Sequence, residues 1–255
     1  LGATALAHLR TADVVIGGAR TLALLRHALK PGAVTHDLTG QLKAVPGWVR
    51  AAREAHQACV VLATGDPLCH GIAPYLAQHL CLDALEILPN LSTLQLACAR
   101  VGLAWQDARI VSVHAADAGE WQRGAPPTHG LYALAQALRA EQRLLLLTSP
   151  ANSPDRIARL LLAEGLGSDF HMAVAENLLQ ANEQVHAQLS PAEAASMRFA
   201  ELNVVLLWRS RPRPQPVRFG LADSAFEQRQ PERGLITKQE VRAAVSYTHL
   251  RAHET

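Results

Sequence analysis

At 255 residues, with 49% apolar and 18% charged residues, the chain is long enough to bury the core of one large domain or two small ones. Its net charge of +2 argues against a nucleic-acid partner, and its longest apolar runs, of five or six residues, are too short to span a membrane. The four cysteines are irregularly spaced, with no CxxC pair, so we expect reduced thiols in a cytoplasmic protein and no metal site.

Helices and strands alternate through the first hundred residues. The pattern predicts helices over 3–10, 19–28, 45–56, 71–80 and 94–101, and strands over 13–16, 34–35, 59–63 and 85–88. Ser92 or Thr93 is a good N-cap for the last helix, and Gly102 ends it. Strands that alternate with helices of about ten residues indicate a mainly parallel sheet.

The second half has a different pattern. It predicts strands over 109–114, 143–148, 170–175, 184–188 and 203–208, with helices over 131–139, 154–164 and a short one capped by Ser190. Ser153 and Pro154 begin the second of these helices. We therefore expect an α/β protein with two lobes, residues 1–104 and 105–210, a mixed sheet in the second lobe, and a ligand cleft between them.

Both ends of the chain are unusual. The first element is a helix, whereas an α/β sheet normally begins with a strand, so we expect one strand ahead of Leu1. Residues 211–245 read as a basic, proline-rich linker followed by the start of another module. Residues 246–255 break the preceding pattern, and we expect them to be an artefactual tail.

The most informative segment is the end of the apolar strand at Thr64-Gly65-Asp66-Pro67. Ligands of open α/β sheets bind just outside the carboxyl ends of strands. Gly65 allows close approach of the backbone, and Asp66 offers a carboxylate acceptor. A plain strand-to-helix turn has the same residues. A second alternative is phosphoryl transfer with Asp66 as nucleophile or metal ligand, for which Glu176 is the only other acidic candidate at a comparable strand end.

Several segments, in this order, resemble the tetrapyrrole methylases. They are Ala63-Thr64-Gly65-Asp66-Pro67-Leu68, Ser92-Thr93-x-Gln95-x-Ala97-x-Ala99-Arg100-x-Gly102, Val111-Ser112-Val113-His114, Ala175-Glu176-Asn177-Leu178 and Leu202-Asn203-Val204-Val205. The start, with Ala12-Asp13-Val14-Val15-Ile16-Gly17-Gly18, is similar to the CbiE-type subfamily that forms the N-terminal half of fused precorrin C(5,15)-methyltransferases. The tail 219–242 is similar to the junction into their second, CbiT-like half.

The resemblance implies a two-lobed fold that binds S-adenosylmethionine between the lobes and methylates a precorrin at the meso carbon between rings A and B. It implies a homodimer, and it assigns no catalytic residue. The residues that it places around the cofactor are Thr64, Gly65, Asp66, Leu68, Ser92, Thr93 and Thr148. Alternatives left open are another tetrapyrrole methylase, such as a uroporphyrinogen-type enzyme, and a truncated fragment that binds nothing.

The chain also departs from the family pattern. Cys69 and His70 stand where aromatic residues are usual, and His114-Ala115-Ala116 replaces His-Gly-Arg. Substrate contacts from that arginine are therefore not expected here. His114 could lie near the substrate, although a structural, hydrogen-bonded histidine is the simpler interpretation. Glu176 and Asn177 follow a strand and could face the cleft, or could form a simple turn.

Overall fold

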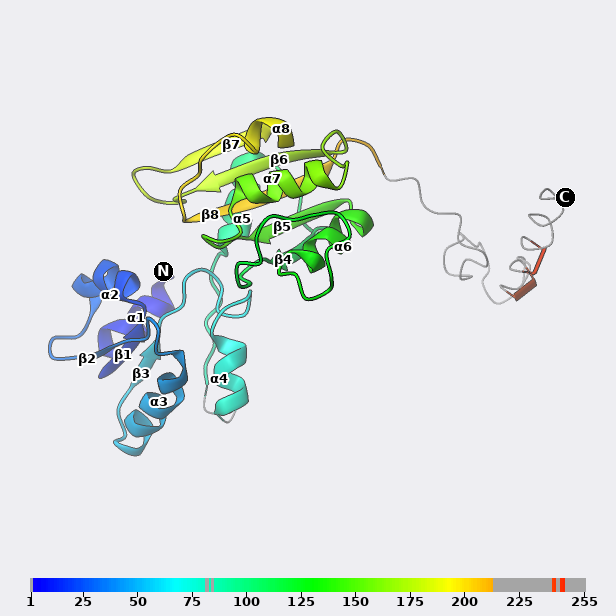
Figure 1. Cartoon of the computed structure of the whole chain (residues 1–255). Helices are drawn as coiled ribbons and strands as arrows, with labels where there is room; N and C mark the ends of the chain where they lie inside the picture. The colour runs from blue at the N-terminus through cyan, green and yellow to red at the C-terminus, as the bar shows by residue number, and fades with distance from the viewer. Residues whose placement is uncertain (1, 81–82, 84, 213–239, 242–243, 246–255) are drawn as a thin grey trace, which may run out of the picture. The chain divides into compact units, whose positions relative to one another are not determined.

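The computed structural model describes residues 2–80, 83, 85–212, 240–241 and 244–245. The chain divides into two compact units, Leu1–Ser210 and Arg211–Thr255, and the helices and strands described below all belong to the first (Figure 1). Most of the predicted linker and the whole predicted tail lie outside the described residues.

The first half of the large unit carries short elements in α/β order. They are α1 (Ala3–Thr11), β1 (Val14–Gly17), α2 (Ala19–Leu25), the 3-10 turn η1 (Arg26–Ala28), β2 (Val34–Asp37), the 3-10 turn η2 (Leu42–Ala44), α3 (Val45–Glu54), β3 (Cys59–Val61), α4 (Ala73–His79) and α5 (Thr93–Val101). Strands β1, β2 and β3 form a parallel sheet in the order β2-β1-β3.

Helices cover both faces of this first sheet. Val14 and Ile16 of β1 pack with α3 and α4, whereas Val15 packs with α1 and α2. Because successive side chains of a strand point to opposite faces, a strand that is covered on both sides has an unbroken apolar sequence. All four residues of β1 are buried, which explains the Val-Val-Ile run.

The second half builds a mixed sheet. Its elements are β4 (Arg109–Ser112), α6 (Tyr132–Ala140), β5 (Arg143–Leu147), α7 (Pro154–Ala163), β6 (Phe170–Glu176), β7 (Gln184–Leu189), α8 (Pro191–Ala194) and β8 (Asn203–Arg209). The strand order is β4-β5-β8-β6-β7; β4 and β5 are parallel, and the other pairs are antiparallel. The predicted combination of a parallel first sheet and a mixed second sheet is confirmed.

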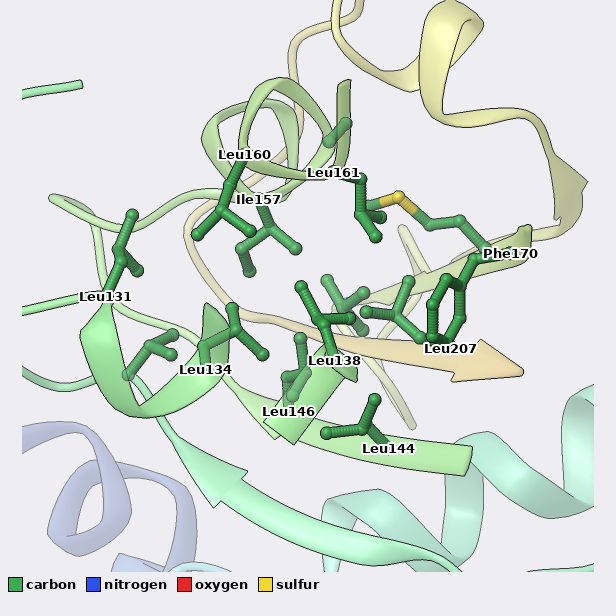
Figure 2. Packing of buried hydrophobic residues seen from close by; sticks show 14 of the residues in the cluster. Leu131, Leu134, Leu138, Leu144, Leu146, Ile157, Leu160, Leu161, Phe170 and Leu207 are labelled. Atoms are coloured by element: carbon green, nitrogen blue, oxygen red, sulfur yellow. The ribbon is translucent and has the colours of Figure 1, made fainter. Parts of the chain in front are cut away.

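The largest core lies on one face of this second sheet. Leu144 and Leu146 of β5 pack there against α6 and α7 (Figure 2). Leu145, which alternates with them, packs on the other face with Leu94 and Ala97 of α5. Helix α5 is therefore fixed to the second sheet, although it follows the elements of the first sheet in the sequence.

The sequence prediction is wrong at 85–88, which form no strand. Among the described strands, β3 stands at the edge of the first sheet. A groove of about 900 Å³ runs along β3, with Val60, Val61 and Leu62 on one wall and residues 85–90 on the other. Gly2 and Ala3, at the start of α1, also line it. A strand needs a hydrogen-bonding neighbour, and the groove separates 85–88 from β3.

Two expectations from composition can be compared with the structure. The three described cysteines, Cys59, Cys69 and Cys98, are free, and burial raises the pKa of the Cys59 thiol to about 11. Cys81 lies outside the described residues. Within the part of the chain that the structure describes, no helix has the length and apolar character needed to cross a membrane.

Candidate functional site

The two corners singled out from the sequence touch each other. Beyond β3 the chain turns at Gly65, whose φ of +73° is in the left-handed region that favours glycine. A Cβ at Gly65 would lie 3.4 Å from the Cα of Ser92 and 3.6 Å from the backbone nitrogen of Thr93. The loop after β3 therefore lies against the start of α5, and it is the positive φ, and not a lack of space, that favours glycine at position 65.

Ser92 is the N-cap of α5. Its Oγ accepts the backbone N–H of Gln95 at 3.1 Å, and Gln95 Oε1 accepts the backbone N–H of Ser92 at 2.8 Å, which is a complete capping box. Thr93 and Leu94 lie in the first turn, so their N–H groups have no intrahelical acceptor. Free amides and the positive end of the helix dipole suit a carboxylate or hydroxyl group of a ligand.

Asp66 turns its carboxylate toward its own loop. Asp66 Oδ1 accepts the backbone N–H groups of Leu68 at 2.7 Å and Cys69 at 3.2 Å, while the Leu68 side chain is exposed. The described residues contain no group of three or more His, Cys, Asp or Glu side chains that could hold a metal ion. Glu176, the other carboxylate of the phosphoryl-transfer alternative, pairs with His186 at 3.0 Å and accepts the backbone N–H of Ala200. The phosphoryl-transfer alternative therefore has no metal-binding cluster among these residues.

Thr148 follows β5 and is buried. Its hydroxyl donates to the backbone oxygen of Asn203 at 2.7 Å and is 2.6 Å from Asn203 Oδ1. Both hydrogen bonds stay inside the second sheet, so the structure does not aim this hydroxyl at the contact between Gly65 and Ser92. Glu176 is also buried, and Asn177 has a φ of +48°, as expected for a residue in a tight turn.

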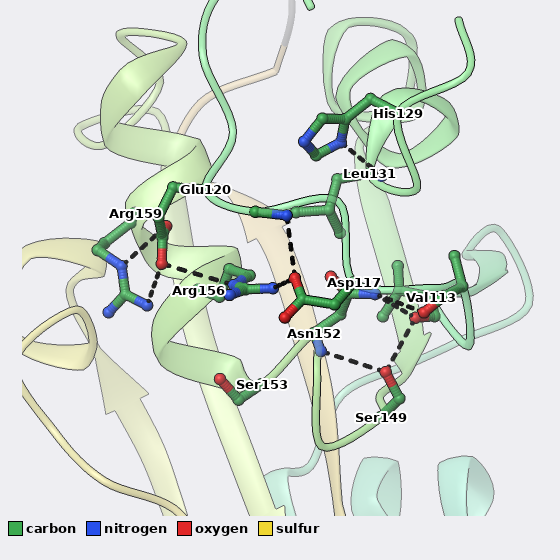
Figure 3. Close-up of polar contacts among 12 residues, drawn as sticks. Val113, Asp117, Glu120, His129, Leu131, Ser149, Asn152, Ser153, Arg156 and Arg159 are labelled. Atoms are coloured by element: carbon green, nitrogen blue, oxygen red, sulfur yellow. Dashed lines mark hydrogen bonds and ion pairs between the residues drawn. The ribbon is translucent and has the colours of Figure 1, made fainter.

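The loop after β4 is fastened to α7 and its preceding turn (Figure 3). The carbonyl oxygen of Val113 accepts the Asn152 side-chain amide at 2.9 Å. Asp117 pairs with Arg156 at 2.5 Å, and Glu120 pairs with Arg159 at 2.9 Å. The segment that replaces the family's His-Gly-Arg thus leads into a loop that is held by ion pairs. His114 itself is exposed, with Nδ1 3.2 Å from the Ser112 hydroxyl.

A second pocket, of about 620 Å³, lies on the far part of the loop that carries Asp66. Residues of this loop, the first turns of α4 and one residue of β4 line it: Leu68, Cys69, His70, Gly71, Pro74, Tyr75, Gln78 and Ile110. The sequence singled out Cys69 and His70 but missed Tyr75 and Gln78. Their spacing of three residues places them on one helix face and is a usable signal, whereas nothing in the sequence indicates Ile110.

The parallel first sheet, the mixed second sheet and the glycine corner against a helix N-terminus describe an α/β protein with a candidate site for a small molecule. The family model of the Tetrapyrrole (Corrin/Porphyrin) Methylases matches residues 1–192. The chain therefore belongs to the tetrapyrrole methylases. Members of this family use S-adenosylmethionine, and the chain is an S-adenosylmethionine-dependent methyltransferase.

Relatives of named activity match most of the chain. It is 30% identical over 200 residues to a cobalt-precorrin-7 C(5)-methyltransferase of Salmonella typhimurium, covering 78% of this chain and 88% of that protein. It is 33% identical to a decarboxylating precorrin-6Y C(5,15)-methyltransferase of Sinorhizobium sp, covering 91% of this chain and 51% of that protein. A crystal structure of the cobalt precorrin-4 methyltransferase CbiF shares the fold, with a TM-score of 0.64, 18% identity, and coverage of 82% of this chain and 88% of that chain.

Proposed function

We propose that this chain methylates a precorrin of the precorrin-6Y or cobalt-precorrin-7 type in cobalamin biosynthesis, at the meso carbon between rings A and B. The observation that carries the proposal is the contact between Gly65 and Ser92, which brings the loop after β3 against the N-terminus of α5. The activities of the two named relatives, at 30% and 33% identity, support the choice of substrate.

Methyl transfer from S-adenosylmethionine requires few reactive side chains. When bound, S-adenosylmethionine supplies an electrophilic methyl group on its sulfonium. The protein then has to hold donor and acceptor in line, and such orientation contributes about 7–11 kcal/mol of barrier reduction. A reaction of this kind requires no protein nucleophile, so a site made mainly of backbone groups and a helix terminus is sufficient.

The proposed cofactor site uses the residues expected from the sequence. Gly65 forms the turn that brings the loop after β3 against α5, and the backbone N–H groups of the first turn of α5 donate hydrogen bonds to the anionic end of the ligand. Thr148 contributes through its backbone, because its hydroxyl is occupied by Asn203. The full set is Thr64, Gly65, Asp66, Leu68, Ser92, Thr93 and Thr148.

The rest of the predicted organisation is also a proposal. We propose lobes of 1–104 and 105–210, and an additional strand in the groove beside β3. By family analogy we propose a cytoplasmic homodimer and, after the linker, a CbiT-like domain.

Titration calorimetry with S-adenosylhomocysteine tests the proposal. The chain is measured as it stands and with about 12 added N-terminal residues, enough for one strand and a short loop. Binding by either form supports a methylase site, and binding by only the longer form shows that the shorter one is an incomplete fragment. No binding by either form contradicts the proposal. Assays of the binding-competent form with precorrin-6Y-type, precorrin-7-type and uroporphyrinogen substrates then separate the candidate substrates.

A further inference from the structure

Asp66 is the acidic residue of the candidate site, but its carboxylate acts on the protein's own backbone. Asp66 Oδ1 accepts two successive N–H groups, those of Leu68 and Cys69, at 2.7 Å and 3.2 Å. We infer that Asp66 is a positioning residue, which fixes the loop so that Gly65 stays against Ser92. This inference rests on the proposed function, and it concerns how that site keeps its shape.

The loop has little freedom to change shape. Gly65 and His70 have φ angles of +73° and +53°, in the left-handed region. A Cβ on Gly71 would overlap the carbonyl group of Pro67 and lie 2.9 Å from the backbone oxygen of Asp66. A backbone that passes through two left-handed residues needs compensating interactions, and the two hydrogen bonds to Asp66 supply them.

The same loop borders two features of the molecule. Gly65 contacts Ser92 at one end, while Leu68, Cys69, His70 and Gly71 line the second pocket at the other end. Asp66 lies between these two parts and holds the turn that separates them. Loss of its hydrogen bonds would therefore loosen the wall of the second pocket together with the corner at Gly65.

A positioning role and a direct ionic role predict different results for an isosteric substitution. Two N–H donors require an acceptor oxygen, which the Asn side chain also offers. Ionic contact with the ammonium group of a ligand requires the negative charge. Asp66→Asn therefore keeps the site if Asp66 positions the loop, and Asp66→Ala does not.

The experiment compares Asp66→Asn and Asp66→Ala by S-adenosylhomocysteine calorimetry, in the form of the chain that binds. We expect Asn to bind within about twofold of the parent and Ala to bind about tenfold more weakly, because the Leu68 N–H loses its acceptor and the Cys69 N–H keeps only the backbone oxygen of Asp66, at 3.2 Å. Asp37→Ala is the matched control. Asp37 is the last residue of β2, at the edge of the first sheet opposite β3, and its Oδ1 accepts the Thr39 N–H at 2.9 Å. Removal of this carboxylate should not change the affinity for S-adenosylhomocysteine.

Hydrogen exchange gives a readout that is independent of ligand. The amides of Leu68 and Cys69 should exchange faster in Asp66→Ala than in Asp66→Asn, with the larger change at Leu68, because the Cys69 N–H also donates to the backbone oxygen of Asp66 at 3.2 Å. Equal loss of affinity in both variants, with unchanged exchange at these amides, would overturn the inference and assign the charge to ligand contact. If no form binds S-adenosylhomocysteine, the proposed function fails, while exchange still decides whether Asp66 holds the loop.

Discussion

Substitution of Gly65 by Ala tests the corner on which the proposed site depends. The Cβ at this position would meet Ser92 Cα at 3.4 Å, an ordinary van der Waals distance, so the cost comes from the backbone and not from a clash. A φ of +73° in a residue with a Cβ costs about 1–2 kcal/mol. The loop relieves this strain by returning φ to negative values, which moves the corner away from α5.

If the corner relaxes, a ligand that needs the original geometry must restore the strain. The affinity for S-adenosylhomocysteine then falls by about 5- to 30-fold, because 1.4 kcal/mol corresponds to tenfold. Calorimetry measures this loss, and urea denaturation measures stability on the same samples.

Gly32→Ala provides the matched control. Gly32 has a φ of +80°, and a Cβ there would meet nothing within 4 Å, so the strain is similar and no contact is disturbed. We expect comparable destabilisation and unchanged affinity. Equal affinities for Gly65→Ala and Gly32→Ala, at equal losses of stability, would refute the assignment of the Gly65 corner to the cofactor site.

Three further substitutions, and Ser190→Ala as a control, test which side chains contribute to stability and which to binding. Ser92→Ala removes the capping box of α5, so it should lower the free energy of unfolding by about 1 kcal/mol and weaken the binding of S-adenosylhomocysteine. Ser190→Ala removes the capping box of α8, so it should lower stability by a similar amount and leave the binding of S-adenosylhomocysteine unchanged. Thr148→Val should lower stability by about 1–3 kcal/mol in urea, because the Asn203 acceptors lose their donor, and affinity should stay constant; a large affinity loss would give the hydroxyl a ligand role. Burial opposes ionisation of Glu164, but hydrogen bonds from Arg139 and Trp121 hold the pKa of its carboxyl below the ordinary 4.5. The ionised Glu164 therefore stabilises the fold at neutral pH, and this stabilisation is lost as the pH falls through the lowered pKa. In urea denaturation at pH 7, the free energy of unfolding of Glu164→Gln should be about 1–2 kcal/mol below that of the parent, and this difference should shrink in acid. A difference that does not change with pH would exclude the charge of Glu164 as its cause.

The sequence predicted best where the signal is local. Ser92 forms the capping box, and Gly102, with a φ of +70°, ends α5 at the expected position. Ser153 occupies the N-cap position of α7, but its hydroxyl bonds Asp155 and caps no backbone amide. Side-chain choice between nearby acceptors depends on the neighbouring residues in space, which a linear pattern does not record.

Long-range pairing was beyond the sequence. In the second sheet β8 pairs with both β5 and β6. The sequence does not indicate this order, because all three strands are apolar runs of similar length. The failure at 85–88 has the same origin, since Leu85 and Ile87 have strand-like alternation but border the groove beside β3. Propensity alone does not make a strand when the neighbouring hydrogen-bonding edge is not adjacent.

The candidate site joins elements of two different cores. Gly65 follows β3, which packs with the helices of the first sheet, whereas Ser92 begins α5, which is fixed to the second sheet through Leu94 and Ala97. The position of a ligand that contacts both Gly65 and Ser92 therefore depends on how the two sheets lie relative to each other. Alignment of a methyl donor with its acceptor depends on that position, so substitutions that loosen α5 on the second sheet should impair catalysis even where every residue around the cofactor is retained.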